Sequence, residues 1–236
     1  MSERLLQILI DSFPKMLIPG LTMTIPLTAI AFTFAMIIAV AAAMVQYAKI
    51  PVLTQLCRFY IWIFRGTPLL VQLFVVFYGL PDLGIRMDPF PAAVLVFSLN
   101  EGAYCAETVR AALEAVPEGQ MEAGYCAGMS YMQTMRRIIL PQAMRTAFPP
   151  LSNSLIAMVK DTSLAANITV VEMFRASEQI NARVYEPLAL YIEVGLIYLM
   201  FSTVLTWLQR AGEAKLGAYE KQAHRFSIVI IVRLPF

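Results

Sequence analysis

The residues of this sequence that could do chemistry are charged side chains inside apolar segments. Lys160 and Asp161 are neighbours near the end of a stretch that is otherwise free of charge from Thr146 onward. A charged group inside a bilayer is costly unless it meets a partner or a water-filled cavity, so such residues usually mark functional sites. An ammonium beside a carboxylate supplies a donor and an acceptor, the two groups that a zwitterionic ligand requires.

Neighbouring helix positions point about 100° apart, so Lys160 and Asp161 cannot satisfy each other by facing the same way. At least one of them must meet another helix or a ligand. An internal ion pair with Glu101, Glu107 or Glu193 is the alternative to a ligand. The residue types leave both interpretations open.

Four other polar residues are candidates for the same cavity. Asn100, Tyr104 and Glu107 lie at positions i, i+4 and i+7, so they share one face of a helix. Ser154 precedes Lys160 in its segment, and a neutral hydroxyl suits a neutral polar ligand better than a cationic one. Close helix packing through a small side chain is the alternative role for Ser154.

The composition argues against catalysis, metal binding and nucleic-acid binding. His224 is the only histidine, in a polar tail, which leaves little for histidine-based acid–base or metal chemistry. Cys57, Cys105 and Cys126 are odd in number and lack a CxxC spacing, so we expect small apolar packing residues. The net charge of +2 comes without basic runs, which argues against nucleic acid. We expect no enzyme, no metal and no cofactor in this chain.

The elements that position the candidate residues are apolar segments of membrane-spanning length. Hydrophobic residues make up 59% of the 236 residues and charged residues 14%. About 20 apolar residues span a bilayer as a helix, which pairs its own backbone groups. We predict an all-α integral membrane protein with five transmembrane helices, at about 17–46, 58–80, 90–112, 147–168 and 187–209.

These spans form one predicted domain, residues 1–225. Pro19 and Pro26 predict a kink or a broken start in the first span. Residues 226–236 form a short apolar tail to which no role is assigned. With the N-terminus outside, 12 Lys and Arg residues lie inside and 5 outside, with Lys160 within a span. Cytoplasmic loops carry the excess of basic residues, so we expect N-out and C-in.

The longest cytoplasmic segment, about 113–146, keeps helical periodicity. Met121, Tyr125 and Met129 recur at four-residue steps. We expect two short helices on the membrane surface, with stop signals at Gly128 and Pro141, and a disordered loop as the alternative.

Inside this segment, small residues and one glutamate form a compact pattern. Glu122 can offer a charge to a partner, and the small residues Ala123 and Gly124 let another backbone approach closely. Gly128 permits a tight reversal that a Cβ would resist. The pattern predicts a helix–turn–helix knob that docks on a partner. A hairpin that packs only on its own bundle is the alternative.

This segment resembles the EAA loop of binding-protein-dependent ABC importer permeases, E-A-A-x-x-x-G followed by I-x-L-P. The matching residues are Glu122, Ala123, Gly124, Gly128, Ile138, Leu140 and Pro141, with Gly in place of the third-position Ala. The segments FRGTPLLVQLF at 64–74, AYCAETVRAAL at 103–113 and VKDTSLAANI at 159–168 are similar to the polar amino acid branch. YGLPDLGIRMDP and LPQAMRTAFPPLSNSLIAMVKDTSLAA look most like L-cystine permease subunits.

The resemblance implies a type I ABC importer permease-like fold in a multi-pass protein of the bacterial inner membrane. It also implies a second permease copy or near relative, two cytoplasmic ATP-binding subunits and an extracytoplasmic solute-binding protein. The chain contains no G-x-x-x-x-G-K-[ST] phosphate loop, so ATP and Mg are expected on the ATPase partner. The knob from Glu122 to Pro141 would transmit closure of the ATPase dimer.

L-Cystine is the expected substrate, and glutamine, glutamate or a cationic amino acid is the alternative within the family. In relatives that look like carriers of cationic amino acids, the residue after the Asn corresponding to Asn153 is often acidic, whereas this chain has Ser154. An ion-coupled secondary transporter that works alone is the alternative from another class.

Overall fold

The N-terminal part of the chain is one long helix. The computed structural model describes the backbone of residues 3–232 and the side chains of residues 3–216. α1 (Glu3–Pro19), a π-helical turn η1 (Gly20–Thr24) and α2 (Ile25–Tyr47) run on without a break. The predicted kink or broken start at Pro19 and Pro26 is therefore a π turn, which accommodates the missing proline N–H within a continuous helix.

The predicted segment 58–80 is not one helix. α3 (Pro51–Gly66) is followed by α4 (Leu69–Phe74), η2 (Val75–Gly79) and η3 (Leu80–Leu83), and the two parts meet at 103°. Thr67 and Pro68 are both extended at the junction. The ring of Pro68 disfavours a helical conformation at Thr67, which explains the bend.

The central helix pair is α2 with α5 (Pro89–Glu114), which covers the predicted third span. Ala39 and Ala43 of α2 and Ala103 and Ala106 of α5 are fully buried in one cluster. Side chains this small let two helix backbones approach closely. α5 is therefore the central buried helix, and it carries the candidate residues Asn100, Tyr104 and Glu107.

Of the two short surface helices that were predicted, only the first is a separate short helix. α6 (Gly119–Cys126) is short and separate, but α7 (Tyr131–Thr134) continues through η4 (Met135–Ile139), α8 (Leu140–Asp161) and η5 (Thr162–Ile168). Pro141 does not end a helix, because it follows the π turn η4 and stands in the first turn of α8. The knob is thus joined directly to the predicted fourth span.

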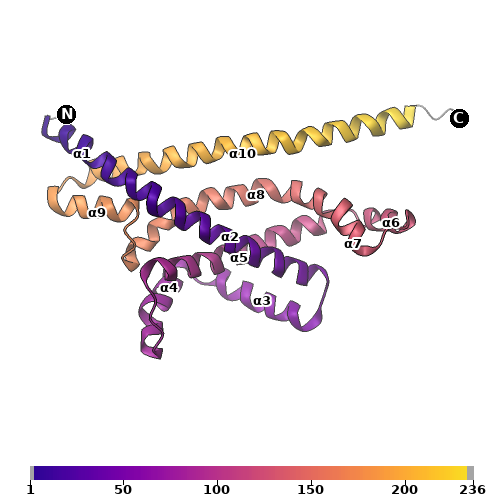
Figure 1. Cartoon of the computed structure of the whole chain (residues 1–236), viewed down its shortest axis with the longest axis horizontal. Helices are drawn as coiled ribbons and strands as arrows, with labels where there is room; N and C mark the ends of the chain where they lie inside the picture. Colours follow the sequence, from indigo (N-terminus) through magenta and orange to yellow (C-terminus); the bar gives the residue numbers. More distant parts are fainter. Residues whose placement is uncertain (1–2, 233–236) are drawn as a thin grey trace.

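The C-terminal part adds a helix that the sequence did not predict and a longer last helix. α9 (Met173–Val184) precedes α10 (Pro187–Val232), which continues beyond the predicted end at 209. The side chains of the 226–236 tail lie outside the described residues. The start of α1 and α9 lie at one end of the molecule, and α6, α7 and the last turns of α10 lie at the other (Figure 1).

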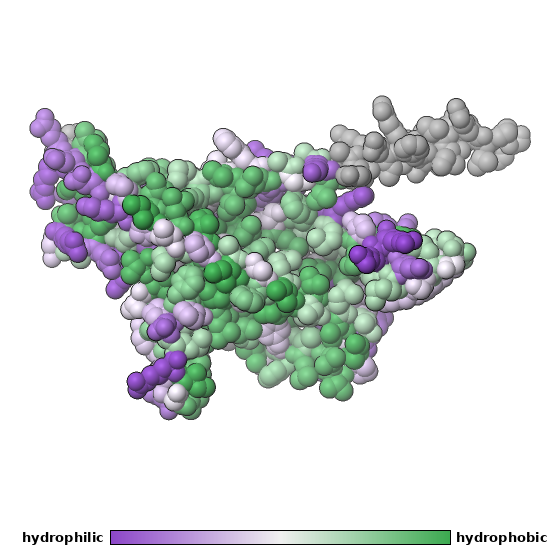
Figure 2. Space-filling view, viewed as in Figure 1, coloured by the Kyte–Doolittle hydropathy of each residue, from purple (hydrophilic) through white to green (hydrophobic). Residues whose placement is uncertain are grey.

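The surface has the pattern of a membrane protein. Hydrophobic residues cover the middle of the molecule, and hydrophilic residues gather toward its ends (Figure 2). Among the described residues, two helices are long and apolar enough to cross a membrane, Glu3–Tyr47 and Pro187–Leu216, and up to four if each bent pair is one span. The number of five spans and the N-out orientation stay predictions.

Candidate functional site

Asn100 of α5 is hydrogen-bonded to residues on both sides of the bend between α3 and α4. Its side-chain amide donates to the carbonyl of Phe64 at 3.1 Å and to Gln72 Oε1 at 3.0 Å. Gln72 in turn donates to the carbonyls of Phe64 and Thr67 and to the Thr67 hydroxyl. The last carbonyls of a helix have no partner within it. Asn100 and Gln72 therefore satisfy the end of α3 and hold the bend.

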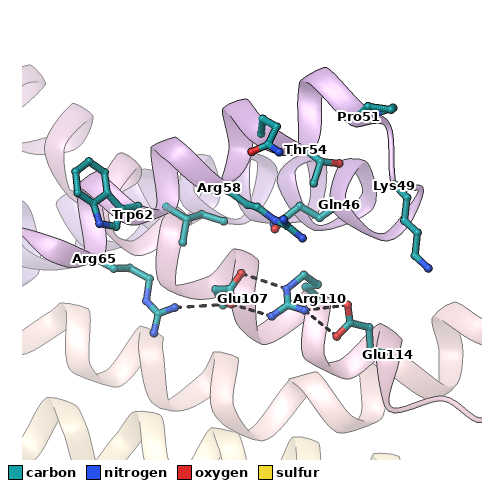
Figure 3. Close-up of a pocket in the computed structure, with 12 residues that line it drawn as sticks. Gln46, Lys49, Pro51, Thr54, Arg58, Trp62, Arg65, Glu107, Arg110 and Glu114 are labelled. Carbon is teal, nitrogen blue, oxygen red and sulfur yellow. Dashed lines mark hydrogen bonds and ion pairs between the residues drawn. The ribbon is translucent and has the colours of Figure 1, made fainter.

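Tyr104 and Glu107 lie along the same side of α5 and meet Arg65, the last basic residue of α3. The Arg65 guanidinium lies 5.2 Å from the centre of the Tyr104 ring and 3.8 Å from Glu107 Oε2. Arg110 donates to the Glu107 carboxylate from Nε at 3.2 Å and from Nη2 at 2.9 Å. Its Nη1 lies 2.7 Å from Glu114 Oε2 (Figure 3). Three predicted residues thus share one face, and that face contacts the end of α3.

A second group forms between α5 and α8. The Cys105 thiol donates to Glu101 Oε1 at 3.4 Å, and the Ser154 hydroxyl lies beside both groups. The Asp161 carboxylate is near enough to Glu101 to repel it electrostatically. Two half-buried carboxylates beside a hydroxyl make a region rich in acceptors. Such a region attracts an ammonium group.

Lys160 is exposed beside this second group and makes no ion pair with any residue that the structure describes. The internal pairs considered for it are not formed. Glu107 is occupied by Arg110 and Arg65, and Glu193 accepts a hydrogen bond from Ser12. The Lys160 ammonium is therefore available as a donor in this conformation.

The turn of the knob is a Schellman motif. Gly128 has φ +74°, its N–H bonds the Tyr125 carbonyl at 2.9 Å, and the Met129 N–H bonds the Gly124 carbonyl at 3.0 Å. Glycine is the residue that adopts this left-handed conformation without strain. Ser130 and Gln133 then form a capping box at the start of α7.

Gly124 packs α6 against α7. A Cβ on Gly124 would lie 2.4 Å from Thr134 Cγ2, so no larger residue fits without movement. Glu122 and Ala123 are exposed on the same short helix. Leu140 is half-buried and Pro141 exposed in the first turn of α8. The knob thus exposes Glu122 and Ala123 together with the large side chains of Tyr125, Tyr131 and Met132, while Gly124 is buried against α7.

Known proteins share this arrangement. Residues 35–217 match the sequence family described as binding-protein-dependent transport system inner membrane component. The chain belongs to this family of ABC importer permeases. The resemblance drawn from the EAA-like loop is confirmed, and this permease is a multi-pass component of the inner membrane.

Relatives of the permease serve amino acid transport. It is 46% identical over 210 residues to the L-cystine transport system permease protein TcyB of Bacillus subtilis, covering 89% of this chain and 90% of the relative. It is 33% identical over 201 residues to the arginine transport system permease protein ArtQ of the same organism, covering 85% and 92%. A chain in the crystal structure of an amino acid ABC transporter with histidines superposes with a TM-score of 0.83 at 32% identity, covering 91% of this chain and 100% of that chain. This permease is therefore a subunit of an amino acid ABC importer.

Glu101, Arg65 and Gln72 are among the residues of the permease's polar groups that were not predicted as site residues. Glu101 appeared only as a pairing alternative, although a carboxylate in an apolar span is itself a signal. Arg65 and Gln72 gave no spacing signal, because their contacts depend on the bend after α3. Among the described residues, no cluster of His, Cys, Asp and Glu could hold a metal ion.

Proposed function

We propose that this permease carries L-cystine into the cytoplasm. In the proposed assembly, two copies, or this chain with a near relative, form the membrane core. Two ATP-binding subunits and an extracytoplasmic solute-binding protein complete it. The relative named for L-cystine transport, at 46% identity, supports the substrate. ATP and Mg belong to the ATPase subunits in this proposal, and the permease itself is not an enzyme.

The observation that carries the proposed binding site is the contact of the Ser154 hydroxyl with Glu101 between α5 and α8, with the Asp161 carboxylate near enough to act on Glu101 electrostatically. The two carboxylates are proposed to accept the substrate ammonium, and Lys160 to donate to its carboxylate. The Ser154 hydroxyl is proposed to face a neutral part of the substrate. Asn100, Tyr104 and Glu107 are proposed to position the α3–α4 bend beside this site, and Asn100 and Tyr104 remain secondary candidates for contact.

Coupling to ATP is proposed to pass through α6. Closure of the ATPase dimer would move the exposed Glu122 and Ala123, and the contact of Gly124 with Thr134 would pass that movement to α7. The helical run that begins at Tyr131 contains Ser154 and reaches Asp161. One continuous helical run therefore connects the proposed docking knob with the proposed substrate site.

Relatives named for other amino acids make cationic substrates the competing candidate. The test is uptake of labelled L-cystine by the whole complex in proteoliposomes, with unlabelled glutamine and arginine as competitors. The proposal expects L-cystine to compete most strongly. Equal competition by arginine would contradict the assignment of substrate.

Ser154 offers the matching mutational prediction. Ser154→Glu should weaken cystine uptake and raise arginine uptake, each by roughly ten-fold, because a new carboxylate favours a cationic side chain by an amount typical of charged hydrogen bonds. Ser154→Ala is the control that removes the hydroxyl without adding charge, and it should lower cystine uptake only. Unchanged substrate profiles in both variants would make Ser154 a packing residue.

A further inference from the structure

A pocket at the corner between α2 and α3 shares Arg65 and Glu107 with the contact between α3 and α5, but its other basic side chains have no role in the proposed transport steps. Its cavity volume is about 610 Å³. Four basic side chains line it, Lys49, Arg58, Arg65 and Arg110, against the two carboxylates of Glu107 and Glu114. Figure 3 shows these residues between α3 and α5. The lining therefore carries an excess of positive charge.

Two of the four basic side chains that line the pocket form ion pairs within it. Arg110 binds both carboxylates, and Arg65 takes the remaining side of Glu107 at 3.8 Å. Lys49 and Arg58 make no ion pair or side-chain hydrogen bond with any described residue, and Arg58 acts on Glu107 only at longer range. Two positive charges thus remain for an anion.

Gln46 adds a donor without a partner. Its side chain lines the pocket from the last turn of α2 and is only 9% exposed. The Gln46 Nε2 group is buried and makes no hydrogen bond with the described residues. Buried polar groups are nearly always paired, so an unpaired donor calls for a ligand or an ordered water. A buried donor beside two unpaired cations suits an oxyanion.

The backbone at the corner holds Lys49 in place. Lys49 has φ +53°, a left-handed conformation that is uncommon outside glycine. Its N–H bonds the Gln46 carbonyl at 3.1 Å. The Ile50 N–H bonds the Val45 carbonyl at 3.5 Å, so these two bonds form a Schellman motif that ends α2. Lys49 and Gln46 are therefore fixed relative to each other.

The rim of the pocket indicates the source of the oxyanion. Trp62 lines the pocket and is 70% exposed, and the neighbouring Phe59 is 59% exposed on the same helix. Their ring centres lie 6.0 Å apart. Exposed tryptophans beside basic residues are typical of the membrane–water interface. A soluble anion would need no such apolar rim, whereas the acyl chains of a lipid would lie along it.

We infer that this pocket binds the headgroup phosphate of an anionic phospholipid, with Gln46, Lys49 and Arg58 as its donors. The phosphate oxygens accept from these three groups, and the acyl chains run along Phe59 and Trp62. Basic residues facing an anionic leaflet strengthen lipid binding in this way.

The test is native mass spectrometry of the purified full chain titrated with phosphatidylglycerol or phosphatidylcholine. The wild-type chain should retain phosphatidylglycerol at least about ten-fold better than phosphatidylcholine. Lys49→Gln with Arg58→Gln should lower phosphatidylglycerol affinity by about 30-fold, which is about five-fold for each cation. Equal retention of the two lipids by the wild-type chain would overturn the inference.

Two further variants separate a built site from general attraction. Gln46→Leu removes the unpaired donor at constant charge and should lower phosphatidylglycerol affinity about three- to ten-fold, with no loss of thermal stability. Arg136→Gln with Arg137→Gln removes the same charge from an exposed part of η4 and should change affinity less than two-fold. An equal loss in both charge-removing doubles, or full affinity in Gln46→Leu, would contradict the site.

Soluble phosphate is the competing source of the same chemistry. Inorganic phosphate and glycerol phosphate, each in large excess over the lipid, should not displace phosphatidylglycerol because they lack acyl chains to bury. Displacement by either soluble anion would overturn the assignment to a lipid.

Discussion

Gly124 is the residue at which the proposed docking knob contacts the helical run that carries the proposed substrate groups. A Cβ there would lie 2.4 Å from Thr134 Cγ2. We predict that Gly124→Ala lowers the stability of the complex by about 1–3 kcal/mol, the usual cost of overpacking, and reduces uptake. Gly119→Ala is the matched control in the same helix, because its added Cβ meets nothing within 4 Å.

Thermal unfolding and uptake, measured on both variants, check this prediction. Gly119→Ala should be neutral or stabilising by up to about 1 kcal/mol, since alanine favours a helix. Equal stability and equal uptake in the two variants would mean that the Gly124–Thr134 contact transmits nothing.

The sequence predicts local backbone requirements of single residues, but it does not predict their contacts across helices. The turn at Gly128 is a local requirement, so its spacing after Glu122 was enough to predict it. The small residue at position 124 could be predicted, but its contact with Thr134 could not, because that contact depends on how α6 folds back. Glu101 meets Ser154 across two helices, and that pairing depends on helix rotation rather than on spacing.

At the scale of elements, the α3–α4 bend is held by Gln72 and Asn100. We predict that Asn100→Ala and Gln72→Ala are not additive in unfolding free energy, with a coupling of about 0.5–3 kcal/mol, because both remove bonds to the same helix end. A double-mutant cycle on thermal or denaturant unfolding measures this coupling. Additive losses, with Asn100→Ala raising KM for uptake, would instead make Asn100 a substrate contact.

The start of α9 offers a second prediction at this scale. Glu172 is fully buried and accepts from the N–H groups of Phe174 and Arg175 and from the Tyr198 hydroxyl, at 2.6–2.9 Å. Glu172→Gln should cost about 1–3 kcal/mol of stability, because one amide oxygen cannot accept all three bonds. Glu178→Gln removes a partly exposed pair with Arg175 and should cost at most about 1 kcal/mol. Unfolding measurements that rank these variants in reverse would contradict the capping role.

The elements were predictable where apolar length decides them and not where proline chemistry does. The third predicted span coincides closely with α5, because its apolar residues extend over the whole buried helix. Pro141 was wrongly expected to stop a helix, whereas a π turn accommodates it. Pro68 lies within the predicted segment 58–80 and marks a 103° bend there, as its effect on the preceding residue favours. α9 is polar and short, so hydrophobicity gave no signal for it.

At the scale of the whole molecule, the two ends are joined by continuous helices. The knob lies at the end opposite the N-terminus (Figure 1), and the run from Tyr131 to Ile168 leads from it into the bundle. This continuity is what the proposed coupling requires, because movement of the proposed docking knob would reach the proposed substrate site through one helical run. The sequence contains no G-x-x-x-x-G-K-[ST] phosphate loop, so the proposed transport depends on ATP hydrolysis by the proposed ATPase subunits.

Uptake of labelled L-cystine into proteoliposomes tests that requirement most directly. The complex of this permease with its ATPase subunits and solute-binding protein should accumulate cystine only when ATP and Mg are supplied on the side of the membrane that holds the ATPase subunits. Liposomes that contain the permease alone should take up no more than protein-free liposomes. Cystine uptake by the permease alone, driven by an ion gradient or without ATP, would contradict the account.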